Sequence, residues 1–252
     1  MESEPKVVGI IPARYQSTRL EAKLLADICG KPMIQRTYEG AAKASLLSDL
    51  VVAADDQRII DAVRSFGGKA VMTSPSHRSG TERCAEVAAS LLDCDIIVNV
   101  QGDEPLIQPE VVDRAAKLLI EDPLPEMATL SSKTDAQEEL LDRAVVKVVF
   151  DSKGYALYFS RALLPHSKTG SVKEAITYYR HIGIYSYRRE FLLRYVNLPR
   201  SKLEIAEELE QLRALDNGYR IKVGVVEDFS LNVDTPEHLE RVRKIICQNS
   251  SS

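Results

Sequence analysis

The stretch that decides the fold is VVGIIPARYQSTRLEAK, residues 7–23. Its first five residues are apolar and mostly β-branched, which is typical of a strand buried on both faces of a parallel sheet. Pro12 then removes a backbone donor and ends the hydrogen-bond ladder. The polar loop that follows gathers two hydroxyls and three cations: Ser17, Thr18, Arg14, Arg19 and Lys23.

This loop is predicted to bind an anion. In open α/β sheets, ligands bind beyond the carboxyl ends of the parallel strands, which is where the loop begins. Cations that lie close together repel one another, and a polyphosphate would relieve that repulsion by accepting hydrogen bonds from guanidinium groups and pairing with an ammonium. A solvated surface loop with extended side chains is the alternative that these residues leave open.

The composition narrows the class of protein. The chain has 252 residues, enough to bury a sizeable core, and its 44% hydrophobic and 28% charged residues are ordinary for a globular protein. The formal net charge of −4 argues against general nucleic-acid binding, because no basic excess exists to displace counterions. A basic loop in an acidic protein therefore suits a small anion better than a polymer.

The cysteines and the first residues favour an intracellular protein. Cys29, Cys84, Cys94 and Cys247 lack the close spacing of a metal site or a redox motif, so we expect them to stay reduced in a cytosolic setting. Residues 1–6 are too few and too charged for a signal peptide, and no apolar run approaches the length of a membrane span. We expect a cytoplasmic protein with no membrane partner.

The first part of the chain alternates between strand and helix patterns. Apolar strand runs are expected at 7–11, 50–54, 69–73 and 96–100, and helical spacing is expected at 32–44, 57–66 and 81–92. Successive β–α units imply parallel pairing with right-handed crossovers. The predicted fold is α/β, with a Rossmann-like, doubly wound, mostly parallel sheet.

The second part of the chain predicts a smaller antiparallel subdomain. Two apolar runs, 145–150 and 155–160, flank the turn Asp151-Ser152-Lys153-Gly154, which is typical of a hairpin. Further strands are expected at 127–130, 178–187 and 221–226, and helices at 111–121, 189–195, 202–216 and after Pro236. We expect one domain over 1–247, with a lid-like or dimer-forming antiparallel excursion at about 145–200, and a mobile polar tail at 248–252.

Two carboxylates are candidates for a metal site. Asp103 follows the strand run at 96–100, and Asp234 lies where an extended segment meets the last helix. Mg²⁺ usually takes one or two protein carboxylates together with phosphate oxygens. Each residue has a structural alternative, since Asp103 suits a turn before Pro105 and Asp234 or Thr235 suits a helix N-cap. With the cationic loop, the two carboxylates outline metal-assisted phosphoryl or nucleotidyl transfer.

A family resemblance begins in the run IIPARYQSTRLEAKLLADICGKPMI, residues 10–34, which is similar to the N-terminal signature of the CMP-sugar synthetases. Further blocks follow in the order found in that family: SGTER at 79–83, VNVQGDEP at 98–105, AVVKVV at 144–149, YALYFSRA at 155–162, YRHIGIY at 179–185, LEQLR at 209–213 and VDTPEHL at 233–239. The resemblance covers nearly the whole chain. It is nearest to the members that use 3-deoxy-manno-octulosonate (Kdo).

The resemblance implies a reaction and a set of site residues. CTP and Kdo would give CMP-Kdo and diphosphate with Mg²⁺, through attack of the sugar's anomeric hydroxyl on the α-phosphorus, as a step of lipopolysaccharide biosynthesis in a homodimeric enzyme. The implied catalytic residues are Arg14, Lys23 and the metal ligands Asp103 and Asp234. The implied nucleotide-binding residues are Ala13, Arg14, Ser17, Arg19, Lys23, Ser79 and Gln101. The implied sugar-binding residues are Arg161, His181, Tyr185, Glu210 and Gln211, with Arg161 pairing with the Kdo carboxylate.

Each implied sugar residue also has a structural alternative. His181 is typical of a hydrogen-bonded core residue in an aromatic strand, and Tyr185 of ordinary sheet packing. Arg161 suits an edge cation. Glu210 and Gln211 are expected on one helix, where adjacent side chains point about 100° apart, so one of them would face solvent.

Two other functions compete with Kdo activation. A synthetase for CMP-sialic acid or a related nonulosonic acid would share the cationic loop but needs a different sugar pocket. A non-catalytic sugar-nucleotide binding protein would tolerate loss of the metal carboxylates, yet Asp103 and Asp234 are both present.

One segment departs from the family pattern. The family has Pro-Gly before the loop lysine and Pro after it, whereas this chain has Leu20-Glu21-Ala22-Lys23-Leu24. Replacing glycine with Ala22 restricts φ, and Glu21 adds an anion beside the expected phosphate site. We expect activity to survive because the loop cations are all present.

Overall fold

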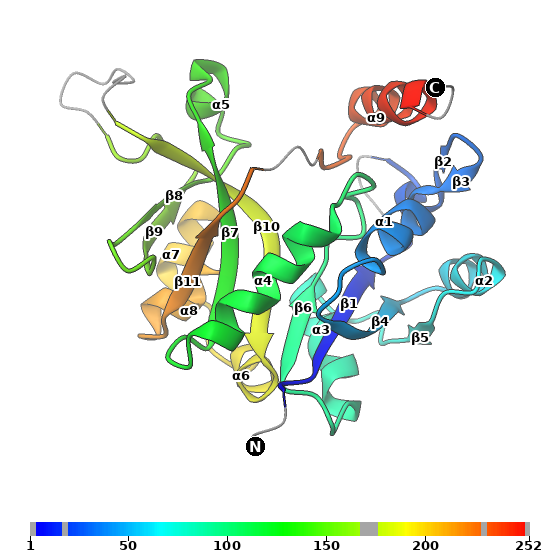
Figure 1. Ribbon diagram of the computed structural model, residues 1–252, viewed down its shortest axis with the longest axis horizontal. Helices are drawn as coiled ribbons and strands as arrows, with labels where there is room; N and C mark the ends of the chain where they lie inside the picture. Colours follow the sequence, from blue (N-terminus) through cyan, green and yellow to red (C-terminus); the bar gives the residue numbers. More distant parts are fainter. Residues whose placement is uncertain (1–3, 17–19, 167–175, 228–230, 250–252) are drawn as a thin grey trace. The chain divides into compact units, whose positions relative to one another are not determined.

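The structure is a computed structural model that describes residues 4–16, 20–166, 176–227 and 231–249 (Figure 1). The chain divides into two compact units, one formed by Met1–Asp113 with Phe229–Ser252 and the other by Arg114–Asp228. Strand pairing confirms the expected mixed α/β fold with a mostly parallel sheet. None of the helices within the described residues has the length and apolar content needed to cross a bilayer.

The first unit is built on parallel strands. β1 (Val7–Ala13) pairs with β4 (Leu47–Ala54) on one side and with β6 (Ile96–Asn99) on the other, and β5 (Ala70–Met72) extends the sheet beyond β4. Ile10 and Ile11 have no exposed surface, so β1 is buried on both faces as its sequence predicts. Parallel pairing brings the carboxyl ends of these strands to one edge of the sheet.

The helices of the first unit include α1 (Met33–Ala41), α2 (Gln57–Ser65) and α3 (Gly80–Ser90). α2 packs on β4 and β5, while α3 packs on β1, β4 and β6. Each begins where the sequence offers a cap: the Asp56 side chain accepts a hydrogen bond from the Arg58 N–H, and the Ser79 hydroxyl accepts one from the Glu82 N–H. The caps place both helix starts just after the sheet's carboxyl edge.

The second unit is organised around β7 (Met127–Thr134). This strand pairs in parallel with β11 (Ile221–Val225) and antiparallel with β10 (Tyr178–Arg188). The predicted hairpin is confirmed as β8 (Lys147–Phe150) and β9 (Ala156–Ser160), whose turn closes through Gly154 at φ 78°. β8 joins the sheet beside β10.

The helices of the second unit correct one prediction. In place of a continuous helix at 202–216, the structure has α7 (Lys202–Glu207) and α8 (Leu212–Asp216). The break falls at Glu208, whose left-handed φ of 53° cannot continue a right-handed helix. The remaining helices are α5 (Gln137–Leu141), α6 (Arg189–Tyr195) and α4 (Pro109–Glu121), which begins in the first unit and ends in the second.

The C-terminal helix α9 (Pro236–Asn249) belongs to the first unit and contacts the short hairpin β2 (Asp27–Ile28) and β3 (Lys31–Pro32). This hairpin of two-residue strands is not predicted from the sequence, and α9 extends to Asn249, into the segment expected to be a tail.

A disulfide between Cys29 and Cys247 joins the hairpin to α9. The expectation that every cysteine stays reduced is therefore wrong for this pair, because residues 218 apart in sequence show no spacing signal. Cys84 and Cys94 are buried and, within the described residues, take part in no disulfide, as expected.

Candidate active site

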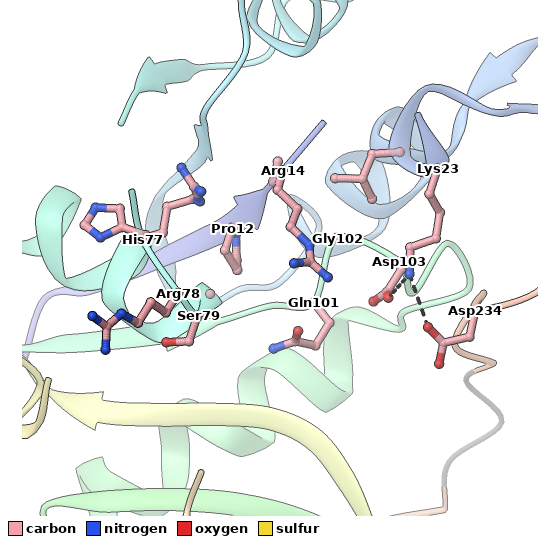
Figure 2. A pocket seen from close by; sticks show the side chains of 14 residues that line it. Pro12, Arg14, Lys23, His77, Arg78, Ser79, Gln101, Gly102, Asp103 and Asp234 are labelled. Carbon is pink, nitrogen blue, oxygen red and sulfur yellow. Dashed lines mark hydrogen bonds and ion pairs between the residues drawn. The ribbon is translucent and has the colours of Figure 1, made fainter. Parts of the chain in front are cut away.

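A pocket of about 330 Å³ lies at the carboxyl ends of β1 and β6 in the first unit (Figure 2). Its walls come from the chain after β1, the one-turn helix η1 (Lys23–Leu25), the segment before α3, the turn after β6 and the residues before α9. The implied nucleotide and metal residues that line it are Ala13, Arg14, Lys23, Ser79, Gln101, Asp103 and Asp234. Ser17 and Arg19 lie outside the described residues.

Lys23 lies between the two implied metal ligands. Its Nζ is 2.5 Å from Asp103 Oδ2 and 3.3 Å from Asp234 Oδ1, and all three side chains are largely shielded from solvent. Figure 2 shows the carboxylates converging on this ammonium from separate segments of the chain. The sequence prediction that a loop cation and two distant aspartates share one site agrees with this placement.

A strained residue presents Lys23 to the pocket. Ala22 adopts a left-handed conformation with φ 48° and ψ 33°, and its carbonyl accepts a hydrogen bond from the Leu25 N–H at 2.8 Å. The turn that follows buries Leu24, which leaves Lys23 on the pocket side. Ala22 therefore has a backbone conformation that glycine adopts more easily than alanine.

The turn after β6 presents Gln101 and Asp103. The hydroxyl of the buried Thr37, on α1, donates to the Gly102 carbonyl at 3.0 Å and fixes the turn. A side chain at Gly102 would come within 3.2 Å of the Pro12 carbonyl, so the turn approaches the end of β1 closely. Asp103 thus occupies the turn that its sequence predicts, and its carboxylate also reaches Lys23.

Asp234 is not the N-cap of α9. The Thr235 hydroxyl accepts the hydrogen bond from the His238 N–H at 3.3 Å and takes that role, which leaves the Asp234 carboxylate directed at Lys23. The Val233 N–H donates to the Asp103 carbonyl at 3.0 Å and joins the two carboxylate segments through the main chain. The choice between Asp234 and Thr235 is settled by which side chain lies over the first turn of the helix.

Two residues that were not expected from the sequence, an arginine and a histidine, also line the pocket. Arg78 and His77 line it from the loop before α3, opposite Lys23 in Figure 2. Within the described residues, neither the Arg14 nor the Arg78 side chain makes an ion pair, and both are exposed. Arg78 could have been predicted by the rule that ligands bind beyond the carboxyl ends of parallel strands, because the loop that carries it follows β5.

The second unit brings the implied sugar residues together. The rings of His181 and Tyr185 lie 5.4 Å apart on β10, and the charge of Glu210 raises the pKa of Tyr185 beyond the increase caused by burial. Arg161, after β9, donates through Nε to the Glu207 carbonyl at 2.9 Å. Glu210 and Gln211 lie in the break between α7 and α8, and the expected placement of both on one helix is wrong.

The Arg161 guanidinium donates hydrogen bonds to three main-chain carbonyls. Besides the Glu207 carbonyl, Nη1 donates to Arg143 O at 3.1 Å and Nη2 to Glu208 O at 3.5 Å. The side chain is therefore held against the turn that carries Glu210 and Gln211. Within the described parts of the chain, two of its five N–H donors remain for a ligand.

His181 is neutral over the physiological pH range. Burial lowers the pKa of the imidazole to about 3, although the residue as a whole is only partly buried. Its Nε2 lies 2.9 Å from Thr129 Oγ1, whose own hydrogen goes to the Ile184 carbonyl at 2.7 Å. Nε2 must therefore donate, which leaves Nδ1 as an acceptor.

Buried polar atoms in the second unit lack partners among the described residues. The amide nitrogen of Gln211 and the hydroxyl of Ser132 make no hydrogen bond, yet these residues are only 3% and 4% exposed. Buried polar groups are nearly always paired, so such atoms point to a ligand or an ordered water. Gln211 is one of the residues that the family resemblance implies for the sugar.

The whole sequence is similar to known cytidylyltransferases. A family profile described as Cytidylyltransferase matches residues 8–222. The 3-deoxy-manno-octulosonate cytidylyltransferase of Geotalea uraniireducens is 54% identical, with 94% of this chain and 97% of that protein covered. The protein of the same name from Protochlamydia amoebophila is 46% identical, with 99% and 98% covered.

Solved structures share the fold. A CMP:2-keto-3-deoxy-manno-octonic acid synthetase in complex with CTP matches with a TM-score of 0.91 at 44% identity, covering 97% of this chain and 99% of that one. A 4-diphosphocytidyl-2C-methyl-D-erythritol synthase from Anaerococcus prevotii matches with a TM-score of 0.64 at 13% identity, over 97% of this chain and 100% of that one, which is a likeness of fold alone.

Proposed function

The chain belongs to the cytidylyltransferase family of nucleotidyltransferases, and from this premise we propose that it converts CTP and Kdo into CMP-Kdo and diphosphate. The observation that carries the proposal is the placement of Lys23 between Asp103 and Asp234 in a pocket at the sheet's carboxyl edge. Relatives that match nearly the full length of the chain are named 3-deoxy-manno-octulosonate cytidylyltransferase, and one synthetase of the same fold was solved in complex with CTP. The product would enter lipopolysaccharide biosynthesis.

We propose Mg²⁺ as the cofactor. Asp103 and Asp234 are the residues that would hold it, and hard carboxylate oxygens from two segments are the donor set that Mg²⁺ takes when phosphate supplies further oxygens. When bound, the ion would neutralise phosphate charge and polarise the reacting phosphoryl group. Among the described residues, no group of three or more His, Cys, Asp or Glu side chains is placed to hold a metal ion.

The proposed mechanism needs positioning and charge neutralisation from the protein. The oxygen of the anomeric hydroxyl of Kdo forms a bond to the α-phosphorus and its proton passes to water. The bond from that phosphorus to the bridging oxygen breaks, and diphosphate leaves with the electron pair. Arg14 and Lys23 bind the phosphates, and Arg78 adds a cation on the facing wall. The Ala13 main chain, Ser79 and Gln101 line the same pocket and would bind the nucleoside.

The sugar would be bound by residues of the second unit. The unpaired amide of Gln211 donates, and Nδ1 of the neutral His181 accepts, so together they suit a hydroxyl-rich ligand. The two remaining donors of Arg161 suit a carboxylate. Tyr185 and Glu210 complete the set that the family resemblance implies.

Substitution of the aspartates tests the proposal. Diphosphate release from CTP, Kdo and Mg²⁺ should fall on the order of 100-fold or more in Asp103→Asn and in Asp234→Asn, with little change in melting temperature. The matched control is Asp93→Asn, which removes an exposed carboxylate paired with Lys6 in the same unit and should leave the rate unchanged. Full turnover in both pocket variants would overturn the metal assignment.

A substrate panel tests the choice of substrates. CTP against UTP, crossed with Kdo against N-acetylneuraminate, should give turnover only for CTP with Kdo. Turnover with N-acetylneuraminate instead would assign a CMP-sialic acid synthetase.

We also propose a homodimer that works in the cytoplasm. Leu157 on β9 is 63% exposed within the segment expected to form the subunit contact, and burying such apolar surface favours association. Size-exclusion chromatography with light scattering should give twice the mass of one chain. Cell fractionation should place the activity in the cytosolic fraction. A monomeric mass at micromolar concentration would contradict the dimer.

A further inference from the structure

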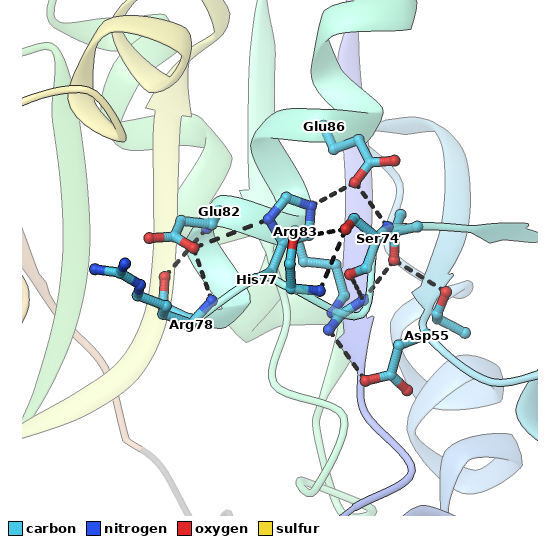
Figure 3. Close-up of polar contacts among 11 residues, drawn as sticks. Asp55, Ser74, His77, Arg78, Glu82, Arg83 and Glu86 are labelled. Carbon is cyan, nitrogen blue, oxygen red and sulfur yellow. Dashed lines mark hydrogen bonds and ion pairs between the residues drawn. The ribbon is translucent and has the colours of Figure 1, made fainter.

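We propose that Asp55 and Arg83 form a positioning pair that holds two loops of the nucleotide pocket in the geometry that binds CTP. The inference rests on the proposed function and adds two residues to which that function assigns no role. Asp55 follows β4, and Arg83 lies on α3. Asp55 contacts the segment after β1, and Arg83 contacts the loop before α3 (Figure 3). These two segments form different walls of the pocket.

Asp55 grips the chain on both sides of Arg14. Its Oδ1 accepts the Tyr15 N–H at 2.9 Å, and its own N–H donates to the Ala13 carbonyl at 3.3 Å. The two peptide groups that flank Arg14 are therefore tied to one residue. The direction in which Arg14 enters the pocket depends on these two bonds.

A second contact holds the same segment. The Arg58 guanidinium lies over the Tyr15 ring, 3.4 Å from its centre, and is itself paired with Asp56 at 2.7 Å. The junction between β4 and α2 thus clamps both the backbone and the ring of Tyr15. A cation over an aromatic face adds attraction beyond packing.

Arg83 performs the corresponding task for the opposite wall. Its Nη1 donates to Thr73 Oγ1 at 2.6 Å and to the Ser74 carbonyl at 3.2 Å, which lie at the start of the loop that carries His77, Arg78 and Ser79. Figure 3 shows the guanidinium lying beneath this loop. The loop is held again by α3, because Glu86 accepts the Ser74 N–H at 3.0 Å and Glu82 accepts the Arg78 N–H at 2.7 Å.

One ion pair joins the two walls. Arg83 Nη2 donates to Asp55 Oδ2 at 3.1 Å, and the side chains are only 5% and 15% exposed. Both oxygens of Asp55 and both terminal nitrogens of Arg83 are therefore engaged with pocket loops or with each other. A buried ion pair is weak support for stability on its own, whereas its fixed geometry can specify one arrangement of the groups around it. Here those groups carry Arg14 on one side and Arg78 on the other.

The test measures CTP affinity directly. Asp55→Asn and Arg83→Lys should each weaken binding of CTP with Mg²⁺, followed by calorimetry, by on the order of tenfold. Because the residues act as one unit, the double variant should lose little more than either single variant. In steady-state assays the KM for CTP should rise while the KM for Kdo stays constant, a split that general loosening of the fold would not give.

A matched control separates positioning from stability. Arg188 is a half-buried arginine of the second unit whose guanidinium donates to the carbonyls of Pro125, Leu119 and Asp122, none of which lines the pocket. Arg188→Lys should lower the melting temperature without changing CTP affinity. If Asp55→Asn and Arg83→Lys fail to fold, Thr73→Val removes a single partner of Arg83 and should weaken CTP binding about threefold.

The outcomes are distinct. Wild-type affinity in the folded variants, losses that add in the double variant, or an equal rise in the KM for Kdo would overturn the positioning pair while the proposed function stands. A wild-type protein that does not bind CTP would overturn the proposed function and this inference with it.

Discussion

At the scale of single residues, Ala22 is the point where the segment between β1 and η1 stores strain. Its φ of 48° lies in the left-handed region, where a Cβ atom crowds the following carbonyl. The conformation is needed because the turn that starts here directs Lys23 at Asp103 and Asp234. Residues held in strained backbone conformations cluster at binding sites.

We therefore expect Ala22→Gly to stabilise the protein. Relief of the Cβ contact should raise the free energy of unfolding by about 0.5–1 kcal/mol, after the greater freedom of glycine in the unfolded chain is subtracted. Urea denaturation measures the change. Ala26→Gly is the control, because Ala26 has φ −58° and gains nothing from glycine. Equal destabilisation by both substitutions would contradict strain at Ala22.

His181 makes a prediction about pH. The folded pKa of about 3 lies below the unfolded value of about 6.5, so the unfolded chain binds the extra proton between them. Stability should therefore be unaffected by this residue above about pH 6.5 and should fall as the pH drops below it, by up to about 1.4 kcal/mol per pH unit. Denaturation at about pH 7 and about pH 5 should show a smaller loss in His181→Asn than in the wild type. Parallel losses would show that His181 is protonated in the folded protein.

The site residues differ in how far the sequence could assign them. Lys23 and Asp103 follow strands at the sheet's carboxyl edge, and a rule about where ligands bind in parallel sheets is enough to bring them together. The role of Asp234 needed coordinates, because Asp234 and Thr235 fit an N-cap equally well until one side chain is seen over the helix. Arg83 lies one turn into a helix, where no local pattern separates a buried positioning residue from a solvated one.

At the scale of elements, the break between α7 and α8 shows a limit of periodicity. Residues 202–216 have the spacing of one helix, yet the chain turns at Glu208 and presents Glu210 and Gln211 from a loop. A left-handed residue other than glycine leaves no mark in the apolar pattern. The break matters for function, since side chains from a turn can converge on one ligand more readily than adjacent residues of a helix.

The tether of α9 gives the prediction for this scale. The Cys29–Cys247 disulfide closes a loop of 218 residues, and loss of such a cross-link frees the unfolded chain. Dithiothreitol should lower the free energy of unfolding by about 2–4 kcal/mol. Activity should persist, because Arg243 still joins α9 to β2 through hydrogen bonds to the Asp27 carbonyl at 2.8 and 2.7 Å. Cys29→Ser is the control, and dithiothreitol should not change its free energy of unfolding. If dithiothreitol leaves the free energy of unfolding of the wild type unchanged as well, the two cysteines do not form a disulfide.

At the scale of the whole molecule, the sequence alone predicts which part of the chain forms parallel strands and which part forms antiparallel strands. Continuous apolar runs separated by helical segments mark β1, β4 and β6, and the turn at 151–154 marks the β8–β9 hairpin. The division of the chain into two units could not be predicted from the sequence. The first unit is assembled from both ends of the chain, and residues that come together from opposite ends, such as Lys23 and Asp234, leave no local pattern.

This division leads to a prediction about unfolding. The implied nucleotide residues within the described chain belong to the first unit and the implied sugar residues to the second, while α4 runs without a break from one unit into the other. Because melting one end of a continuous helix exposes the other, we expect one cooperative transition, with equal calorimetric and van't Hoff enthalpies. CTP with Mg²⁺ at about 100 times its Kd should stabilise the folded state by about 2.7 kcal/mol and raise the Tm of that single transition by roughly 5–10 °C. Two peaks, of which CTP moves only one, would show instead that the units unfold separately and would identify the one that binds the nucleotide.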